Sequence, residues 1–223
     1  MSAPLMLHEL TGSPNSVKIR IALGYKGLDY ERQPVDLDDF PGDRATAVSL
    51  SRQPRFPILQ HGDAVIFDSS AILRYIEANF RETPSIFTDD YATFGEIETW
   101  EAFASTQIGP PIGMAFGQAF APEADPDALA QANEMLSDCT AELEQKVGAD
   151  KFLVGDGLTA ADIVCAAPLY LTDMTAEMAA QHPITQFFGD NLKLGDDRPQ
   201  TREWLRRLMA YDAVLGQRTM STA

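Results

Sequence analysis

Four polar residues near the N-terminus carry the side chains best suited to chemistry: Thr11, Ser13, Asn15 and Ser16. Ser13 precedes Pro14, and a serine N-cap followed by proline at the first helical position is typical of a helix start. A hydroxyl at that place can donate a hydrogen bond to a thiolate brought by a ligand, which lowers the thiol pKa from ~8.5 towards neutrality. Cysteines at positions 13 and 16 would make a redox centre. Serines stand at both of these positions, which excludes a dithiol–disulfide cycle here. Ser13 can equally serve as an N-cap and nothing more.

Two further places in the sequence call for a chemical or structural reason. Pro57 lies in an apparent strand, where it removes a ladder hydrogen bond. A cis Phe56–Pro57 bond would explain it and would turn the main-chain groups of Phe56 outward; a trans proline at an edge or in a loop is the alternative. Asp68 and Ser69 precede an apolar helical stretch, which either residue can cap.

The residues for other chemistry are scattered. His8, His61 and His182 lack the spacing of metal ligands, so we expect no metal. The sequence has neither a Walker loop nor a Gly-x-Gly-x-x-Gly motif. Cys139 and Cys165 are too few for a disulfide framework, and we expect both thiols to be inert.

The elements that must position these residues begin with a mixed α/β pattern. Short apolar runs and helical stretches alternate in the order strand, helix, strand, then strand, strand, helix. This order predicts a four-stranded mixed sheet with helices on its faces, interrupted by a polar stretch around Pro41 and Gly42. The expected strands span 4–10, 29–37, 56–60 and 64–67, and the expected helices begin at Pro14 and after Asp68.

Strand patterns stop after a segment that contains Pro84 and no sustained periodicity. We therefore expect an α/β domain at 1–83, a linker at 84–91 and an all-helical bundle at 92–223, so the fold class is α+β. Gly109 and the two prolines after it must bend or break the first long helix. Thr159 and Asp162 fit a capping box, which is a folding device. The expected helices span 94–120, 128–147, 159–171 and 201–209.

The 223 residues include 17 Lys and Arg against 33 Asp and Glu, a formal net charge of −16. Residues 1–84 hold 9 basic against 11 acidic side chains, or −2, and residues 85–223 hold 8 against 22, or −14. Such a chain repels phosphate backbones and anionic lipid, so we expect no nucleic-acid and no membrane partner, while the nearly neutral first third can host an anionic small ligand. The sequence shows neither a membrane helix nor a secretory signal, so we expect a cytoplasmic protein.

Four motifs resemble those of one protein family. Residues 12–23 (GSPNSVKIRIAL) are similar to the first helix of the glutathione transferases, and residues 56–59 (FPIL) to their third strand with its cis-proline. Residues 68–76 (DSSAILRYI) resemble the family's acidic-Ser-x-Ala-Ile-x-x-Tyr-Leu motif, and residues 152–162 (FLVGDGLTAAD) resemble its folding motif. The four motifs occur in the family's order and span nearly the whole chain. By this resemblance the chain is identified as a glutathione transferase of the serine/asparagine type, similar to bacterial members of the family. The resemblance implies a thioredoxin-like first domain.

The resemblance also implies a glutathione site. Ser13, with Asn15 as a credible co-donor, would stabilise the thiolate of glutathione. The main chain of Phe56, ahead of the cis-proline, would pair with the cysteinyl backbone. Ser69 would hold the γ-glutamyl carboxylate at a helix N-terminus, and Asp68, usually Glu or Gln in the family, would face the ammonium group or fix the Ser69 turn.

The segment before Pro57 departs from the family pattern, because SRQPRFP replaces the usual Asn-Pro-x-Gly-x-Val-Pro. Arg55 or Gln53 could bind the glycyl carboxylate of glutathione, and Arg44 and Arg52 are weaker candidates.

The second substrate is expected between the first strand's end and the first long helix of the helical domain. The implied activity is glutathione transfer to a small hydrophobic electrophile, in detoxification, by a homodimer without a metal cofactor. The alternatives are glutathione-dependent disulfide or peroxide reduction, and a ligand-binding or interaction protein that kept the fold and lost turnover. The candidate pocket residues are Leu10, Thr11, Ile108, Pro111, Met114 and Phe116.

Overall fold

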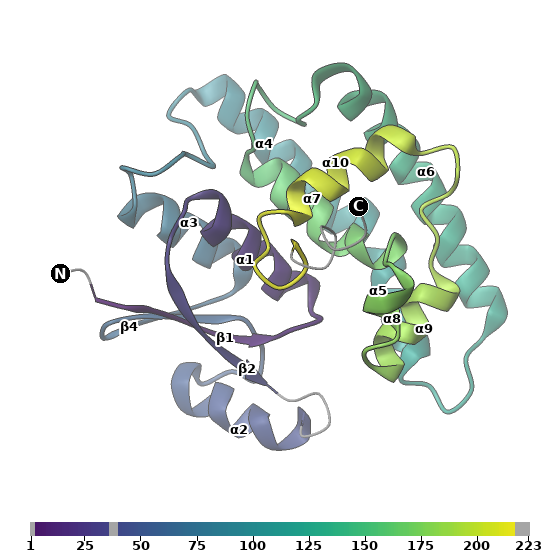
Figure 1. The fold of residues 1–223 in the computed structure, drawn as a ribbon, viewed down its shortest axis with the longest axis horizontal. Helices are drawn as coiled ribbons and strands as arrows, with labels where there is room; N and C mark the ends of the chain where they lie inside the picture. The colour runs from purple at the N-terminus through teal and green to yellow at the C-terminus, as the bar shows by residue number, and fades with distance from the viewer. Residues whose placement is uncertain (1–2, 36–39, 217–223) are drawn as a thin grey trace. The chain divides into compact units, whose positions relative to one another are not determined.

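The computed structural model describes residues 3–35 and 40–216 and divides the chain into two compact units (Figure 1). The first unit runs to Ile86 and includes Tyr211–Ala213 from near the C-terminus. The second unit comprises Phe87–Ala210 and the residues from Val214. A four-stranded mixed sheet with helices forms the first unit and helices form the second, which confirms the predicted fold class.

The sheet of the first unit has the strand order β2-β1-β3-β4. β1 is parallel to β2 and antiparallel to β3, and β3 and β4 form the predicted hairpin. Along β1 every second side chain is buried, and the last of these is the carboxylate of Glu9. The strands are β1 (Leu5–Leu10), β2 (Tyr30–Val35), β3 (Ile58–His61) and β4 (Ala64–Phe67).

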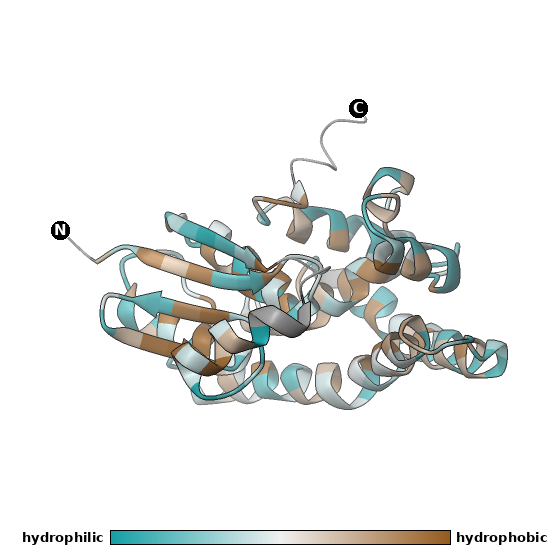
Figure 2. Ribbon diagram, turned by 90° about the horizontal axis from the view of Figure 1, so that it is seen from below, coloured by the Kyte–Doolittle hydropathy of each residue, from teal (hydrophilic) through white to brown (hydrophobic). Residues whose placement is uncertain are grey.

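Helices cover both faces of this sheet: α1 (Pro14–Tyr25) and α3 (Ser69–Asn79) lie on one face and α2 (Phe40–Ser51) on the other (Figure 1). Hydrophobic residues run along the strands between these layers (Figure 2). α2 was not predicted, because the polar stretch around Pro41 and Gly42 does not show a helical pattern. Pro41 lies in the first turn of α2, where a missing N–H leaves no helical hydrogen bond unmade, and Ala47 of this helix is fully buried.

The second unit packs around α7, every residue of which is buried. This helix lies against α4 and α10. In the part of the chain that the structure describes, no helix is long and apolar enough to cross a membrane. The helices are α4 (Tyr91–Phe103), the π-helix η1 (Ala104–Ile108), α5 (Gly109–Ala119), α6 (Pro126–Asp150), α7 (Ala160–Leu169), the 3-10 helix η2 (Tyr170–Thr172), α8 (Ala176–Ala179), α9 (Pro183–Asn191) and α10 (Pro199–Met209).

The predicted break in the first long helix is confirmed, and it takes the form of η1. Pro110 and Pro111 have no N–H to donate to the preceding turn, so regular α-helical bonding cannot run through this region. The sequence reading missed α8 and α9, which are short and start at the side-chain caps Thr175 and His182. Helices of this length carry little periodicity, so only their caps could have indicated them.

Candidate active site

The turn between β1 and α1 holds Ser13 at the start of the helix. Leu10, Thr11 and Gly12 precede it, and the Ser13 N–H donates to the Leu10 carbonyl at 2.9 Å, which closes the turn. Ser13 has the extended backbone of an N-cap (φ −75°, ψ 129°), and its carbonyl accepts the N–H of Val17 at 3.0 Å. The predicted helix start is confirmed, yet the Ser13 side chain makes no capping hydrogen bond. Its hydroxyl therefore has no structural use at the position where a cap would act.

The other two hydroxyls near this turn have different surroundings. Ser16 is fully buried, so its hydroxyl cannot reach a ligand from solvent. Thr11 is half-buried, and its Oγ1 accepts a hydrogen bond from Arg32 on β2 at 3.3 Å. The Thr11 hydroxyl thus keeps its hydrogen to donate, and the half-buried Ser13 hydroxyl, which makes no capping bond, keeps its hydrogen and its lone pairs.

Asn15 links the turn to the start of α3. Its Oδ1 accepts a hydrogen bond from the Ser69 hydroxyl at 3.4 Å and another from Lys18 Nζ at 3.0 Å. The structure thus brings together two predicted site residues that lie 54 positions apart in the sequence. The amide nitrogen of Asn15 donates to none of the residues in 3–35 and 40–216, and the side chain is exposed. This nitrogen is a second available donor.

Asp68 caps α3, as predicted. Its Oδ1 accepts the N–H groups of Ser70 at 2.9 Å and Ala71 at 3.2 Å. The backbone of Asp68 is left-handed (φ 69°), a conformation that costs a non-glycine residue about 1 kcal/mol or more, and the two capping bonds offset it. The sharp turn sets Ser69 as the first residue of α3, 9% exposed. Ser69 is held where the helix dipole favours an anion.

The Phe56–Pro57 bond is cis, which confirms the prediction. Pairing between β3 and β1 begins at Ile58, which lies opposite His8. The main chain of Phe56 therefore lies beyond the end of the ladder, and its side chain is half-buried.

The loop before Phe56 uses the amide of Gln53 to fold itself. Gln53 Oε1 accepts the Arg55 N–H at 2.7 Å, and its Nε2 donates to the Ser51 hydroxyl at 2.7 Å and to the Arg55 carbonyl at 2.9 Å. The guanidinium of Arg55 is exposed, as are Arg52 and Arg44. Gln53 thus shapes the loop, and Arg55 is the better placed of the two to meet a carboxylate.

Four predicted pocket residues belong to the helical unit. Ile108 is fully buried and Pro111 is buried, so both serve its core. Met114 and Phe116 are half-buried, and the Phe116 ring packs on Phe188 with 4.6 Å between centroids. Phe116 is therefore partly a core residue.

The sequence reading missed a set of buried charges in the first unit. Arg20 is fully buried, and its Nε donates to both carboxylate oxygens of Asp212, at 2.9 and 3.0 Å. Glu9 and Asp212 are fully buried too; Glu9 contacts Arg20 through Oε2 and accepts Arg32 Nε at 2.5 Å through Oε1. Burial disfavours the charge on Arg20, but the two carboxylates outweigh it and raise the Arg20 pKa. The alternation along β1, which points Glu9 inward, was the one signal for this set.

Metal and thiol chemistry find no support among the described residues. No group of three or more His, Cys, Asp or Glu side chains in this part of the chain is placed to hold a metal ion. Burial raises the pKa of the Cys139 thiol to about 11. Cys165 is fully buried, with its Sγ 3.6 Å from the Trp100 carbonyl. The Cys139 thiol therefore lacks the depressed pKa of a nucleophile.

Comparison with known families agrees with this geometry. Residues 7–84 match the model of the glutathione S-transferase N-terminal domain, and residues 103–212 match that of the glutathione S-transferase C-terminal domain. Glutathione S-transferase 3 of Zea mays is 31% identical over 165 residues, which cover 72% of this chain and 74% of the relative. The chain belongs to the glutathione S-transferase family.

Two other similarities extend this result. A structure of Ure2p in complex with glutathione superposes with a TM-score of 0.74 at 21% identity, over 93% of this chain and 94% of that one, and so has the same fold. Elongation factor 1-gamma 2 of Oryza sativa subsp. japonica is 28% identical over 177 residues, 75% of this chain but 40% of the relative. A sequence similar to this chain thus also forms part of a longer protein that is named for a different role.

Proposed function

We propose that this chain is a glutathione transferase of the serine/asparagine type, which activates the thiol of glutathione for attack on a small hydrophobic electrophile. The observation that carries the proposal is the Ser13 hydroxyl: it stands at the N-terminus of α1 and makes no capping bond. The Ser16 N–H of the first turn donates to the Ser13 carbonyl, so the hydroxyl keeps its hydrogen and its lone pairs for a ligand.

The proposed chemistry requires a thiolate near neutral pH. Ser13 donates its O–H, and the Asn15 amide nitrogen a second hydrogen bond, to the sulfur of glutathione at the positive end of α1. Lowering the thiol pKa from ~8.5 to about 7 takes ~2 kcal/mol, which two hydrogen bonds to a charged acceptor can supply. The thiol proton leaves to solvent, a sulfur electron pair forms the bond to the electrophilic carbon, and the leaving group departs with its bonding electrons.

The rest of the tripeptide binds the glutathione-binding domain, which we assign to residues 1–83. Ser69 binds the γ-glutamyl carboxylate at the start of α3, in the turn that Asp68 fixes. The main chain of Phe56, which lies beyond the end of the β1–β3 ladder, pairs with the cysteinyl backbone, and the exposed Arg55 meets the glycyl carboxylate.

The test compares wild type, Ser13→Ala, Asn15→Ala and the matched control Ser137→Ala with a chloronitrobenzene acceptor. Ser137 is exposed on α6 in the helical unit. Removing a preorganised donor lowers kcat by about 10²-fold, so we expect this loss in Ser13→Ala, a smaller loss in Asn15→Ala and none in the control. Unchanged turnover in Ser13→Ala would reject Ser13 as the thiolate donor. Faster turnover of cumene hydroperoxide or a mixed disulfide than of the aryl halide would instead assign glutathione-dependent reduction.

The similarity to elongation factor 1-gamma 2 favours one further candidate, a non-catalytic binding module. Calorimetric titration with glutathione separates the two, because the transferase binds it and a module without this site shows no heat at millimolar ligand. We further propose that the protein is a homodimer, which sedimentation at micromolar concentration would test.

A further inference from the structure

The first unit buries a chain of charged side chains that the proposed chemistry does not use. We call it the buried charge cluster: Glu9 on β1, Arg20 on α1, Arg32 on β2 and Asp212 from the Tyr211–Ala213 segment. Three of these residues are fully inaccessible and the Arg32 side chain is 32% exposed. Two positive and two negative charges balance, which makes their burial tolerable.

Glu9 is the branch point of the cluster. One of its carboxylate oxygens contacts Arg20 and the other accepts Arg32 Nε, so neither oxygen can turn without breaking an ion pair. Arg20 in turn is held by both oxygens of Asp212. Glu9 therefore presents a fixed acceptor to Arg32.

Arg32 connects Glu9 to the turn that holds Ser13. The guanidinium is planar, so a bond at Nε fixes the direction of the remaining nitrogens. The Nη2 of Arg32 donates to Thr11 Oγ1 at 3.3 Å, and Thr11 is the second residue of the turn that the Ser13 N–H closes on the Leu10 carbonyl.

The Ser13 side chain makes no capping hydrogen bond that would fix its orientation, so a contact from outside the turn is needed to position it. Since the Ser13 side chain makes no capping bond, the placement of its hydroxyl depends on the main chain of the turn. We propose that Arg32, held by the buried charge cluster, is a positioning residue that fixes Ser13 towards the glutathione sulfur through its hydrogen bond to Thr11. The inference rests on the proposed function.

Thr11 offers a variant pair that separates positioning from folding. Thr11→Val keeps the shape and removes both the acceptor and the hydroxyl hydrogen, whereas Thr11→Ser keeps both. Arg32→Lys keeps the charge beside Glu9 and the Thr11 hydroxyl but loses the fork, so it separates the Arg32 bond from a direct contact of Thr11 with the sulfur. The matched control is Thr83→Val, which removes a hydroxyl bond to the Phe80 carbonyl elsewhere in the same unit.

The main measurement is the ultraviolet absorbance of the bound glutathione thiolate across pH, without any electrophile, so that contacts to the second substrate cannot contribute. We expect Thr11→Val and Arg32→Lys to raise the midpoint of this titration and to lower kcat by about tenfold, with the KM for glutathione little changed. Thr83→Val should behave as wild type, and Thr11→Ser should keep the wild-type midpoint of the thiolate titration.

Each outcome decides between the claims. A Thr11→Val variant with a wild-type thiolate titration overturns the positioning role and leaves the proposed function standing, and so does an equal defect in Thr11→Ser and Thr11→Val. A wild type that binds glutathione without forming a thiolate overturns both.

Discussion

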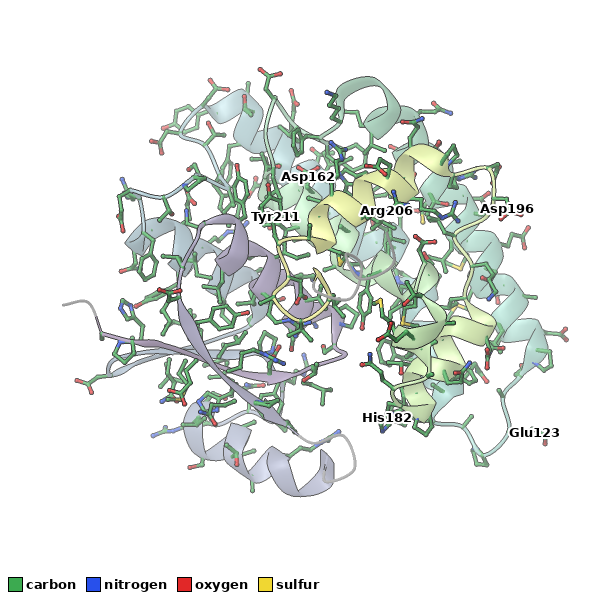
Figure 3. All side chains as sticks on the ribbon, viewed as in Figure 1. Glu123, Asp162, His182, Asp196, Arg206 and Tyr211 are labelled. Carbon is green, nitrogen blue, oxygen red and sulfur yellow. The ribbon has the colours of Figure 1, made fainter. Side chains whose placement is uncertain are left out.

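Replacing Asp162 by alanine should destabilise the helical unit more than the loss of an ordinary helix cap. Its Oδ1 accepts the Leu153 N–H and the Trp204 indole N–H, each at 3.0 Å, and its Oδ2 accepts the Thr159 N–H at 3.0 Å. Figure 3 places Asp162 among the helices of this unit, whereas Glu123 and Asp196 lie at its edge. One carboxylate therefore joins three places: Trp204 of α10, the main chain at Leu153, and the start of α7 at Thr159.

The size of the effect follows from which donors lose their acceptor. Leu153 and Trp204 are buried, and a buried donor without a partner costs roughly 1–3 kcal/mol. Thr159 is half-buried, so water can replace its bond, and the capping box adds ~1 kcal/mol. Burial raises the pKa of Asp162, and alanine removes that unfavourable burial, which offsets part of the loss. The net cost is about 3 kcal/mol.

Two companion variants sharpen the test. Thr159→Ala removes only the cap and should cost ~1 kcal/mol. Asp162→Asn keeps the oxygen that Leu153 and Trp204 share, so it should cost little more than that. Urea unfolding followed by tryptophan fluorescence suits the question, because Trp100 and Trp204 both lie in the helical unit. Equal stability of Asp162→Ala and Thr159→Ala would refute the reasoning, since the two buried donors would then have cost nothing.

Three further substitutions test other contacts. Glu144→Ala removes the carboxylate that accepts the first N–H groups of α10 at 2.7 and 2.9 Å, and should lower the free energy of unfolding by ~1–2 kcal/mol in the same urea assay. Burial alone would raise the pKa of Glu77, but the hydrogen bonds that it accepts outweigh burial and lower it. Stability should therefore fall as the pH drops below ~4.3, and Glu77→Gln should flatten that fall in urea titrations at stepped pH; parallel profiles would contradict this. Gly24→Ala places a Cβ 1.9 Å from the Tyr211 carbonyl oxygen and should cost ~2 kcal/mol in thermal unfolding, while Gly117→Ala, with open space around it, should not destabilise.

Helix starts and hairpin turns are predicted well from the sequence, because the residues that determine them lie within a few positions of one another. Ser13 before Pro14 predicts the start of α1, and the turn before Ala64 predicts the β3–β4 hairpin, because cap and turn chemistry act within a few residues. The cis bond predicted at Pro57 is confirmed, although β3 begins at Ile58 and Pro57 lies just before it rather than in the strand. In α2 the same kind of rule failed, because proline and glycine in a first turn look like a loop when the helix they begin is not recognised.

The contacts that hold the candidate site together could not be predicted this way. The bond from Ser69 to Asn15 joins residues 54 positions apart, and the pair of Arg20 and Asp212 joins residues 192 apart. No local sequence pattern links residues so far apart, and the sequence does not distinguish a buried arginine from an exposed one. Only the inward position of Glu9 on β1 could have indicated that a buried charge needed a partner.

The helix starts of this chain show why Ser13 stands out. Asp68 and Asp90 accept first-turn N–H groups of their helices, and Thr159 shares a capping box with Asp162. α1 begins with an equally good capping residue in the backbone conformation of a cap, yet its oxygen is not used. The first-turn N–H of Ser16 instead donates to the Ser13 carbonyl at 2.9 Å, so the helix start is bonded without the hydroxyl. The oxygens of the used caps are committed to their helices, whereas the Ser13 hydroxyl keeps both its hydrogen and its lone pairs for a ligand at the positive end of α1.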